Sequence, residues 1–308
     1  MTLSLILMRK IASLLLVLFS GYIIVKLKML KASDSHTISV ITLYLVCPCM
    51  IISAFEVDLT PDVVSGLLLA GIAGLVTQVL LVVVTIFLSR FFHFTAVEKD
   101  SIIFSNCGNL IIPLVIATLG SEWVIYSCAY ITVQVVLLWT YGKAVLCGDR
   151  APDIKKILTN VNMISIMIGV LLFVTGIRLP PLVQDAVDSL GSMVGPASML
   201  IAGMLIADMD LSAVFRRPRL WLCVLFRLII YPIFTLVLLK FSGLGSLFPQ
   251  GETVLLVTFL AAISPAASSI TQMAQVYGND AEYANLINVV TLLLCVFSMP
   301  LFVSLYLM

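Results

Sequence analysis

Residues 101–113 read SIIFSNCGNLIIP, an apolar stretch with two asparagines near its centre and a proline at its end. Asn106 and Asn109 lie on either side of Gly108. Pro113 has no N–H and, in a helix, clashes with the carbonyl of the residue four positions earlier, which is Asn109. Lipid offers no donor to a carbonyl freed in this way, so the group must face protein or a cavity. We therefore predict a helix that is broken at Pro113, with the break facing the interior of the protein.

The composition around this stretch is that of a membrane protein. Hydrophobic residues make up 61% of the 308-residue chain and charged residues 11%, whereas soluble proteins carry about 25% charged residues. These fractions exclude an ordinary soluble domain, a disordered chain and a nucleic-acid binder, and the net charge of +1 points to no charged macromolecular partner. The pattern predicts an all-α polytopic membrane protein with ten transmembrane helices. Their predicted bounds are 4–26, 36–55, 62–89, 98–119, 122–146, 158–178, 182–207, 220–241, 252–275 and 282–307.

The basic residues predict the orientation of these spans. Twelve of the 17 Lys and Arg residues fall on one side of the predicted membrane, four fall on the other, and Arg227 lies within a span. The side that is richer in positive charge faces the cytoplasm. We therefore expect a multi-pass protein of the cell membrane with both termini outside the cytoplasm. The connections between the spans are short, which predicts that they hold no soluble catalytic domain.

The two halves of the chain repeat. Residues 1–150 and 151–308 each hold five predicted spans, and an odd number of spans makes the second half enter the membrane from the opposite side. Inverted repeats of this kind are common in secondary transporters. The matched positions keep chain order with slowly drifting offsets, and they pair Gly21 with Gly169, Pro48 with Pro196, Pro113 with Pro265 and Gln134 with Asn288.

The repeat predicts a second broken helix. Within the ninth span, Ser264 and Pro265 form a helix-start signature, with Ser at the N-cap and Pro at the first helical position. Helices four and nine are thus predicted to break at Pro113 and Pro265, although a simple kink is the alternative for either one. The second halves of both helices would start near the middle of the membrane, where their N–H groups and partial positive charge suit a carboxylate.

We expect a substrate site at the point where these N-termini converge. Gln134 and Asn288 either line this site or form hydrogen bonds between helices. The predicted substrate-binding residues are Asn106, Gly108, Asn109, Pro113, Gln134, Ser264, Pro265, Ser268, Ser269 and Asn288.

The remaining polar residues suggest no catalysis and no cofactor. Arg227 is expected to extend toward the membrane interface or, alternatively, to attract an anion in the cytoplasmic access path. Cys47 and Cys49 are too few for a structural metal site, so no metal is expected. No Asp or Glu lies in the middle of a predicted span. Coupling to Na⁺ or H⁺ stays open, because Ser268, Ser269, Gln272 and Asn288 offer oxygens that could hold Na⁺.

Taken together, these motifs resemble the auxin efflux carrier family. The resemblance covers the whole chain and implies a ten-span transporter with two crossed, proline-broken helices, similar in architecture to bile-acid sodium symporters and sodium/proton antiporters. Plant members export the carboxylate auxin, and bacterial members are linked to malate, malonate and related organic acids. The long cytoplasmic loop of many plant carriers is absent here, which resembles the bacterial branch. The motifs are Gly21-Tyr22, Pro48, Asn106-Cys-Gly-Asn109 with Pro113-Leu114, Gly195-Pro196 followed by Gly203, Ser264-Pro265, and Tyr277 through Met299-Pro300-Leu301.

Three functions compete on the sequence alone. The first is a permease that moves a small organic anion, expected to be a carboxylate, by alternating access. The second is a channel-like or structural membrane protein, against which the two broken helices argue. The third, an intramembrane enzyme, is least favoured because no acid pair, metal set or activated nucleophile lies within the spans. The expected partners are the anion and membrane lipid but no nucleic acid, and a homodimer is left open.

Overall fold

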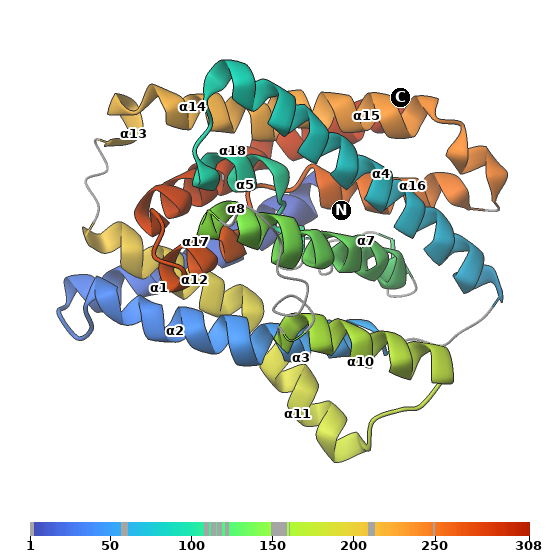
Figure 1. Cartoon of the computed structure of the whole chain (residues 1–308), viewed down its shortest axis with the longest axis horizontal. Helices are drawn as coiled ribbons and strands as arrows, with labels where there is room; N and C mark the ends of the chain where they lie inside the picture. Colours follow the sequence, from blue (N-terminus) through green and yellow to red (C-terminus); the bar gives the residue numbers. More distant parts are fainter. Residues whose placement is uncertain are drawn as a thin grey trace.

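The computed structural model describes residues 3–56, 61–107, 111, 115, 119–120, 123–148, 159, 161–208, 213–248 and 250–308. Apart from one isolated β-bridge, the regular structure of this part of the chain is helical (Figure 1). Six of its helices are long and apolar enough to cross a membrane, and further apolar helices of 10–17 residues accompany them. This is the all-α polytopic membrane architecture that the sequence predicts.

The helices of the first half run in chain order up to the connection near residue 150. They are α1 (Leu3–Lys26), a 3₁₀ turn η1 (Ala32–Asp34), α2 (Ser35–Ile41), a π-helical turn η2 (Thr42–Val46), α3 (Cys47–Ala54), α4 (Pro61–Phe92), α5 (Ala96–Ile103), α7 (Val124–Leu137), a π-helical turn η4 (Leu138–Gly142) and α8 (Lys143–Cys147).

The helices of the second half follow that connection. They are α10 (Val161–Thr175), α11 (Pro181–Gly191), α12 (Val194–Asp208), α13 (Ala213–Arg216), α14 (Pro218–Leu225), a π-helical turn η5 (Phe226–Ile230), α15 (Tyr231–Phe241), a 3₁₀ turn η6 (Leu244–Leu247), α16 (Gly251–Ala262), α17 (Ser268–Val276) and α18 (Ala281–Leu307).

Proline explains two of the three π-helical turns. Pro48 and Pro232 stand just after η2 and η5, and each would clash with the carbonyl four residues earlier, which belongs to Tyr44 or Leu228. Widening the helix by one residue at that carbonyl lets the helix continue past the proline. These turns therefore keep the two spans continuous, and η5 sets the position of Arg227.

The helices form two groups that meet face to face. One group contains α1, α2, α3, α10, α11 and α12, and the other contains α4, α5, α7, α8 and α14–α18 (Figure 1). Helix α1 crosses α12 most closely, and a side chain on Gly203 would collide with the backbone of Leu18. Helices α17 and α18 contact α1, α2 and α12, so the boundary between the groups passes beside α17.

A candidate binding site at the crossing of two broken helices

Two helices are interrupted inside the protein, and their interruptions cross. Helix α5 ends at Ile103, and Phe104 takes extended backbone angles. Helix α16 ends at Ala262, and the chain becomes helical again at Ser268. Ser105 and Ala266 form an antiparallel bridge between the two interruptions. Its hydrogen bonds run from the Asn106 N–H to the Pro265 carbonyl (2.8 Å) and from the Ala267 N–H to the Phe104 carbonyl (3.0 Å).

The structure corrects the residue at which the second half of the ninth predicted span begins, whereas the break predicted at Pro113 lies outside the described residues. In the fourth span the interruption begins at Phe104, well before Pro113. In the ninth span the second half starts at Ser268, with Ala267 rather than Ser264 at the N-cap. Pairing between the two segments keeps residues 264–267 extended, and the Ser264 hydroxyl donates back to the Leu260 carbonyl instead of capping a helix (3.1 Å).

Three predicted site residues lie outside the part of the chain that the structure describes. They are Gly108, Asn109 and Pro113. In the described structure, the carbonyls that the end of α5 leaves without a helical partner are those of Ile102 and Ile103.

Arg227 holds the broken ends together. Its side chain is fully buried, and its guanidinium donates to the carbonyls of Ile102 and Ile103 at the end of α5 and of Ala262 and Ser264 at the end of α16, over 2.6–3.2 Å. Helix C-termini carry partial negative charge, so one cation serves both ends at once. The expectation that Arg227 extends toward the membrane interface is therefore wrong, because its guanidinium donates to these buried carbonyls.

Gln134 secures the crossing from the other side. Its amide oxygen accepts from the Ser105 N–H (3.0 Å) and hydroxyl (2.7 Å), and its NH₂ donates to the Ser105 carbonyl (2.7 Å). Gln78 of α4 donates to the same Gln134 oxygen (3.0 Å) and to the Tyr130 hydroxyl (2.7 Å). In the other interruption the Ala266 N–H is bound by the Thr291 hydroxyl (3.1 Å). The extended segments are thus held by side chains on both flanks.

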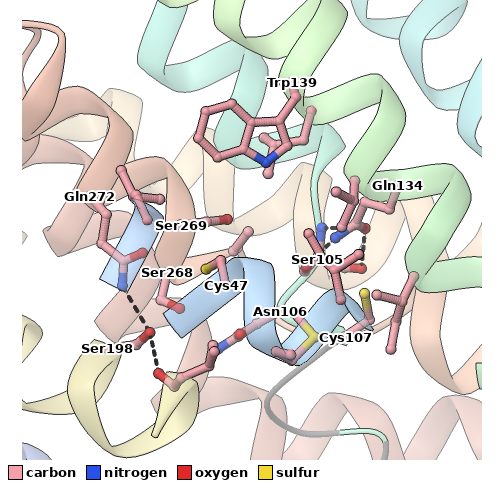
Figure 2. Close-up of a pocket in the computed structure, with 18 residues that line it drawn as sticks. Cys47, Ser105, Asn106, Cys107, Gln134, Trp139, Ser198, Ser268, Ser269 and Gln272 are labelled. Atoms are coloured by element: carbon pink, nitrogen blue, oxygen red, sulfur yellow. Dashed lines mark hydrogen bonds between the residues drawn. The ribbon is translucent and has the colours of Figure 1, made fainter. Parts of the chain in front are cut away.

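A cavity of about 70 Å³ lies beside the crossing, between the two groups of helices (Figure 2). One water molecule needs about 10–15 Å³ of such space, so several water-sized groups fit. Among the described residues no charged side chain lines it. Its polar and thiol lining comes from both groups of helices and consists of Cys47, Ser105, Asn106, Cys107, Gln134, Ser198, Ser268, Ser269 and Gln272.

The cavity contains part of the predicted substrate site. Asn106, Gln134, Ser268 and Ser269 line it, and they come from the two interruptions and from α7. Ser264, Pro265 and Asn288 are not among its lining residues. Of these, Ser264 and Pro265 support the crossing through their carbonyls, as described above.

A family model described as "Membrane transport protein" matches residues 6–152 and 149–303 of this chain. The chain belongs to the membrane transport protein family. This family, which includes auxin efflux carrier-like proteins, is one of transporters and not of enzymes. No curated protein matches the chain. The apolar helices and the family together make it a multi-pass membrane protein.

In this membrane transport protein, sequence reasoning missed Ser198 on the wall of the cavity opposite the crossing and considered Gln272 only as a possible Na⁺ ligand. Ser198 of α12 and Gln272 of α17 face each other there, and the Gln272 amide donates to the Ser198 hydroxyl (2.8 Å; Figure 2). Ser198 follows the Gly195-Pro196 pair that the repeat matches to Pro48. The signal that was available is this pairing, because Cys47, beside Pro48, lines the same cavity.

Proposed function

We propose that this protein is a secondary transporter that moves a small organic anion, a carboxylate, by alternating access, with the substrate bound in the cavity beside the crossing. The proposal rests on one observation: a buried guanidinium binds the ends of both interrupted helices, next to the extended segment that lines this cavity, and no acid among the described residues pairs with it. Arg227 binds four carbonyls, and among the described residues no carboxylate pairs with it. A buried cation that is paired only with neutral carbonyls keeps its net charge, which raises the local potential and favours an anion nearby.

The cavity supplies the contacts that such an anion needs. Ala267, Ser268 and Ser269 line it at the N-terminal end of α17, where N–H groups and partial positive charge gather. The side chains of Asn106 and Gln272 bring neutral amide donors without a competing charge. A carboxylate small enough for this space would be held by hydrogen bonds alone, which suits a site that must also release it.

We further propose the ten-span inverted repeat for this chain, with its halves at 1–150 and 151–308, and a place in the bacterial branch of the auxin efflux carrier family. The two matched segments of the family model meet at residues 149–152, between these halves. The crossed interruptions of α5 and α16–α17 lie in corresponding spans of the two halves. Alternating access would then move one group of helices against the other, across the boundary beside α17.

The orientation is tested by labelling single cysteines in a background without the seven native ones. We expect a cysteine at Lys31 to react with an impermeant maleimide only from the cytoplasmic side, and one at Arg178 only from outside, in the cell membrane. Both positions are exposed, so lack of reaction reflects sidedness rather than burial. The reverse pattern would overturn the orientation, and reaction of both from the same side would overturn the inverted repeat.

Anion binding is tested by placing the same charge inside and outside the cavity. Gln272→Glu places a carboxylate in the cavity lining. Gln275→Glu places one on the same helix but outside the lining, where the Gln275 side chain forms hydrogen bonds with Ser35 and Ser39. Two like charges about 7 Å apart at an effective dielectric constant of about 20 repel by about 2 kcal/mol, so carboxylate affinity should fall by about tenfold to hundredfold in the first variant.

The measurement is a thermal-shift titration of purified protein with C2–C6 mono- and dicarboxylates, followed by counterflow in proteoliposomes with the best binder. Gln275→Glu should keep near-normal affinity. Equal affinity of both variants and the wild type would place the anion elsewhere, and flux without saturation or counterflow would favour a channel.

A further inference from the structure

Helix α5 carries two fully buried acids, Glu98 and Asp100, which differ in their hydrogen-bond partners. Glu98 accepts hydrogen bonds from Arg219 (2.8 and 2.5 Å), from the Tyr283 hydroxyl (3.0 Å) and from the Thr95 N–H (2.7 Å). Asp100 is equally buried, yet neither of its carboxyl oxygens has a hydrogen-bond partner in the described part of the chain. The protein thus satisfies one buried acid completely and leaves the other without a partner.

Asp100 faces the π-helical turn η4 rather than the arginine. Two residues of an α-helix are separated by about 200°, so Asp100 lies on the side of α5 opposite Glu98. Phe104, one turn later, shares that side, and its ring packs against Gly142 of η4, 2.8 Å from where a Cβ would stand. Tyr141, the preceding residue of η4, is partly exposed and close enough to act electrostatically on Asp100.

The other charged and titratable groups on the elements packed against α5 have different partners. Lys99 is the neighbour of Asp100 in the chain and acts on it only through space. Helix α17 carries no titratable side chain. Arg219 of α14 and Tyr283 of α18 bind Glu98, Cys223 of α14 is close to both of them, and Arg227 of η5 binds the carbonyls. Lys143 of α8 lies over the Tyr277 ring, Cys295 of α18 donates to the Leu292 carbonyl, and Tyr306 of α18 stacks on Phe259. The others are Arg90 of α4, Cys147 of α8 and Glu282 of α18.

A carboxylate left in such a place binds a proton, because an isolated buried charge is far more costly than a neutral carboxyl. We propose that Asp100 is a proton-binding site, and that the packing of α5 against α8 and of Phe104 against η4 exists only while this carboxyl is protonated. Loss of the proton leaves a buried carboxylate that must contact water or a cation. Helix α5 has to move to bring Asp100 into such contact.

This movement reaches the substrate cavity directly. The Asp100 carbonyl accepts the Phe104 N–H (2.9 Å), and Phe104 begins the extended segment that carries Ser105 and Asn106 along the cavity. Binding a proton at Asp100 and binding an anion in the cavity therefore act on one continuous stretch of chain. Given the proposed function, on which this step rests, the transported carboxylate moves together with a proton.

The test compares wild type, Asp100→Asn and Glu98→Gln in proteoliposomes that carry the best-binding carboxylate. Asp100→Asn mimics the protonated acid, so we expect it to retain counterflow at equal pH and to lose accumulation driven by a pH gradient. Glu98→Gln weakens a structural pair, so it should melt at lower temperature yet still respond to the gradient.

A second readout does not depend on transport. A folded state that holds a proton which the unfolded chain releases becomes less stable as pH rises. The melting temperature of the wild type should therefore fall between mildly acidic and mildly alkaline pH, and the part of that fall due to Asp100 should be lost in Asp100→Asn. If Asp100→Asn does not fold, external alkalinisation during uptake by the wild type decides: its presence supports the proposal and its absence overturns it.

The outcomes separate the two proposals. Wild-type protein without any counterflow would sink the proposed function, while the pH dependence of melting would still report on Asp100. Wild-type counterflow combined with gradient-driven accumulation that survives in Asp100→Asn would overturn the proton site alone.

Discussion

Arg227→Met is expected to prevent stable folding. The substitution leaves the carbonyls of Ile102, Ile103, Ala262 and Ser264 buried without the donor they share. Each buried acceptor left unpaired costs about 1–3 kcal/mol, and four of them together approach the whole stability of a typical domain, about 5–15 kcal/mol. We expect little monodisperse protein in detergent and a melting temperature too low to measure.

Two variants make this result specific. Arg227→Lys keeps the charge but has three donors in place of the planar fork, so it should fold with clearly reduced thermal stability. Arg90→Met removes an exposed arginine at the end of α4 and should melt like the wild type. An Arg227→Met protein that purified and melted normally would show that the carbonyls find other donors, and the crossing would then not depend on the guanidinium.

The sequence predicted the break at Pro265, but it did not predict that α5 ends at Ile103. Proline marks a place where a helix can break, and Pro265 does lie inside the interruption of the ninth span. The interruption of the fourth span starts at Phe104, a residue with no helix-breaking property of its own. It is extended because its carbonyl pairs with Ala267, more than 160 residues away, and no local pattern carries that information.

The contacts of Arg227 could not be predicted from the local sequence either. A lone arginine in an apolar span is normally interpreted by its distance from the interface, and that reasoning led to an outward-reaching side chain. Its actual partners are backbone carbonyls, which every residue has and which therefore leave no trace in the sequence. The cavity residues on the crossing itself, such as Asn106 and Ser268, were predictable because they stand beside the breaks.

The repeat match between Gln134 and Asn288 predicts equal roles, whereas the structure assigns unequal ones. Gln134 binds Ser105 through three hydrogen bonds and lines the cavity. Asn288 is buried, and neither atom of its amide has a partner among the described residues. In the second half it is Thr291, one helical turn later, that holds the crossing.

Replacing each of these two amides by leucine should therefore have opposite effects. Gln134→Leu leaves the Ser105 N–H and carbonyl unpaired, removes one partner of the Ser105 hydroxyl and takes an acceptor from Gln78. At about 1–3 kcal/mol for each group the loss is several kcal/mol, and the extended segment next to Asn106 loses its support. We expect a large fall in melting temperature and loss of measurable carboxylate binding in the protein that can be purified.

Asn288→Leu removes a buried amide that makes no hydrogen bond in the described structure and replaces it with an apolar group of similar size. Deleting an unsatisfied polar group is neutral or stabilising, so this variant should melt at the wild-type temperature or above it. Its carboxylate affinity should be unchanged, because Asn288 does not line the cavity. Melting curves and titrations of the two leucine variants side by side decide the matter: equal losses would mean that the repeat, and not the contacts around Ser105, assigns the roles of these residues.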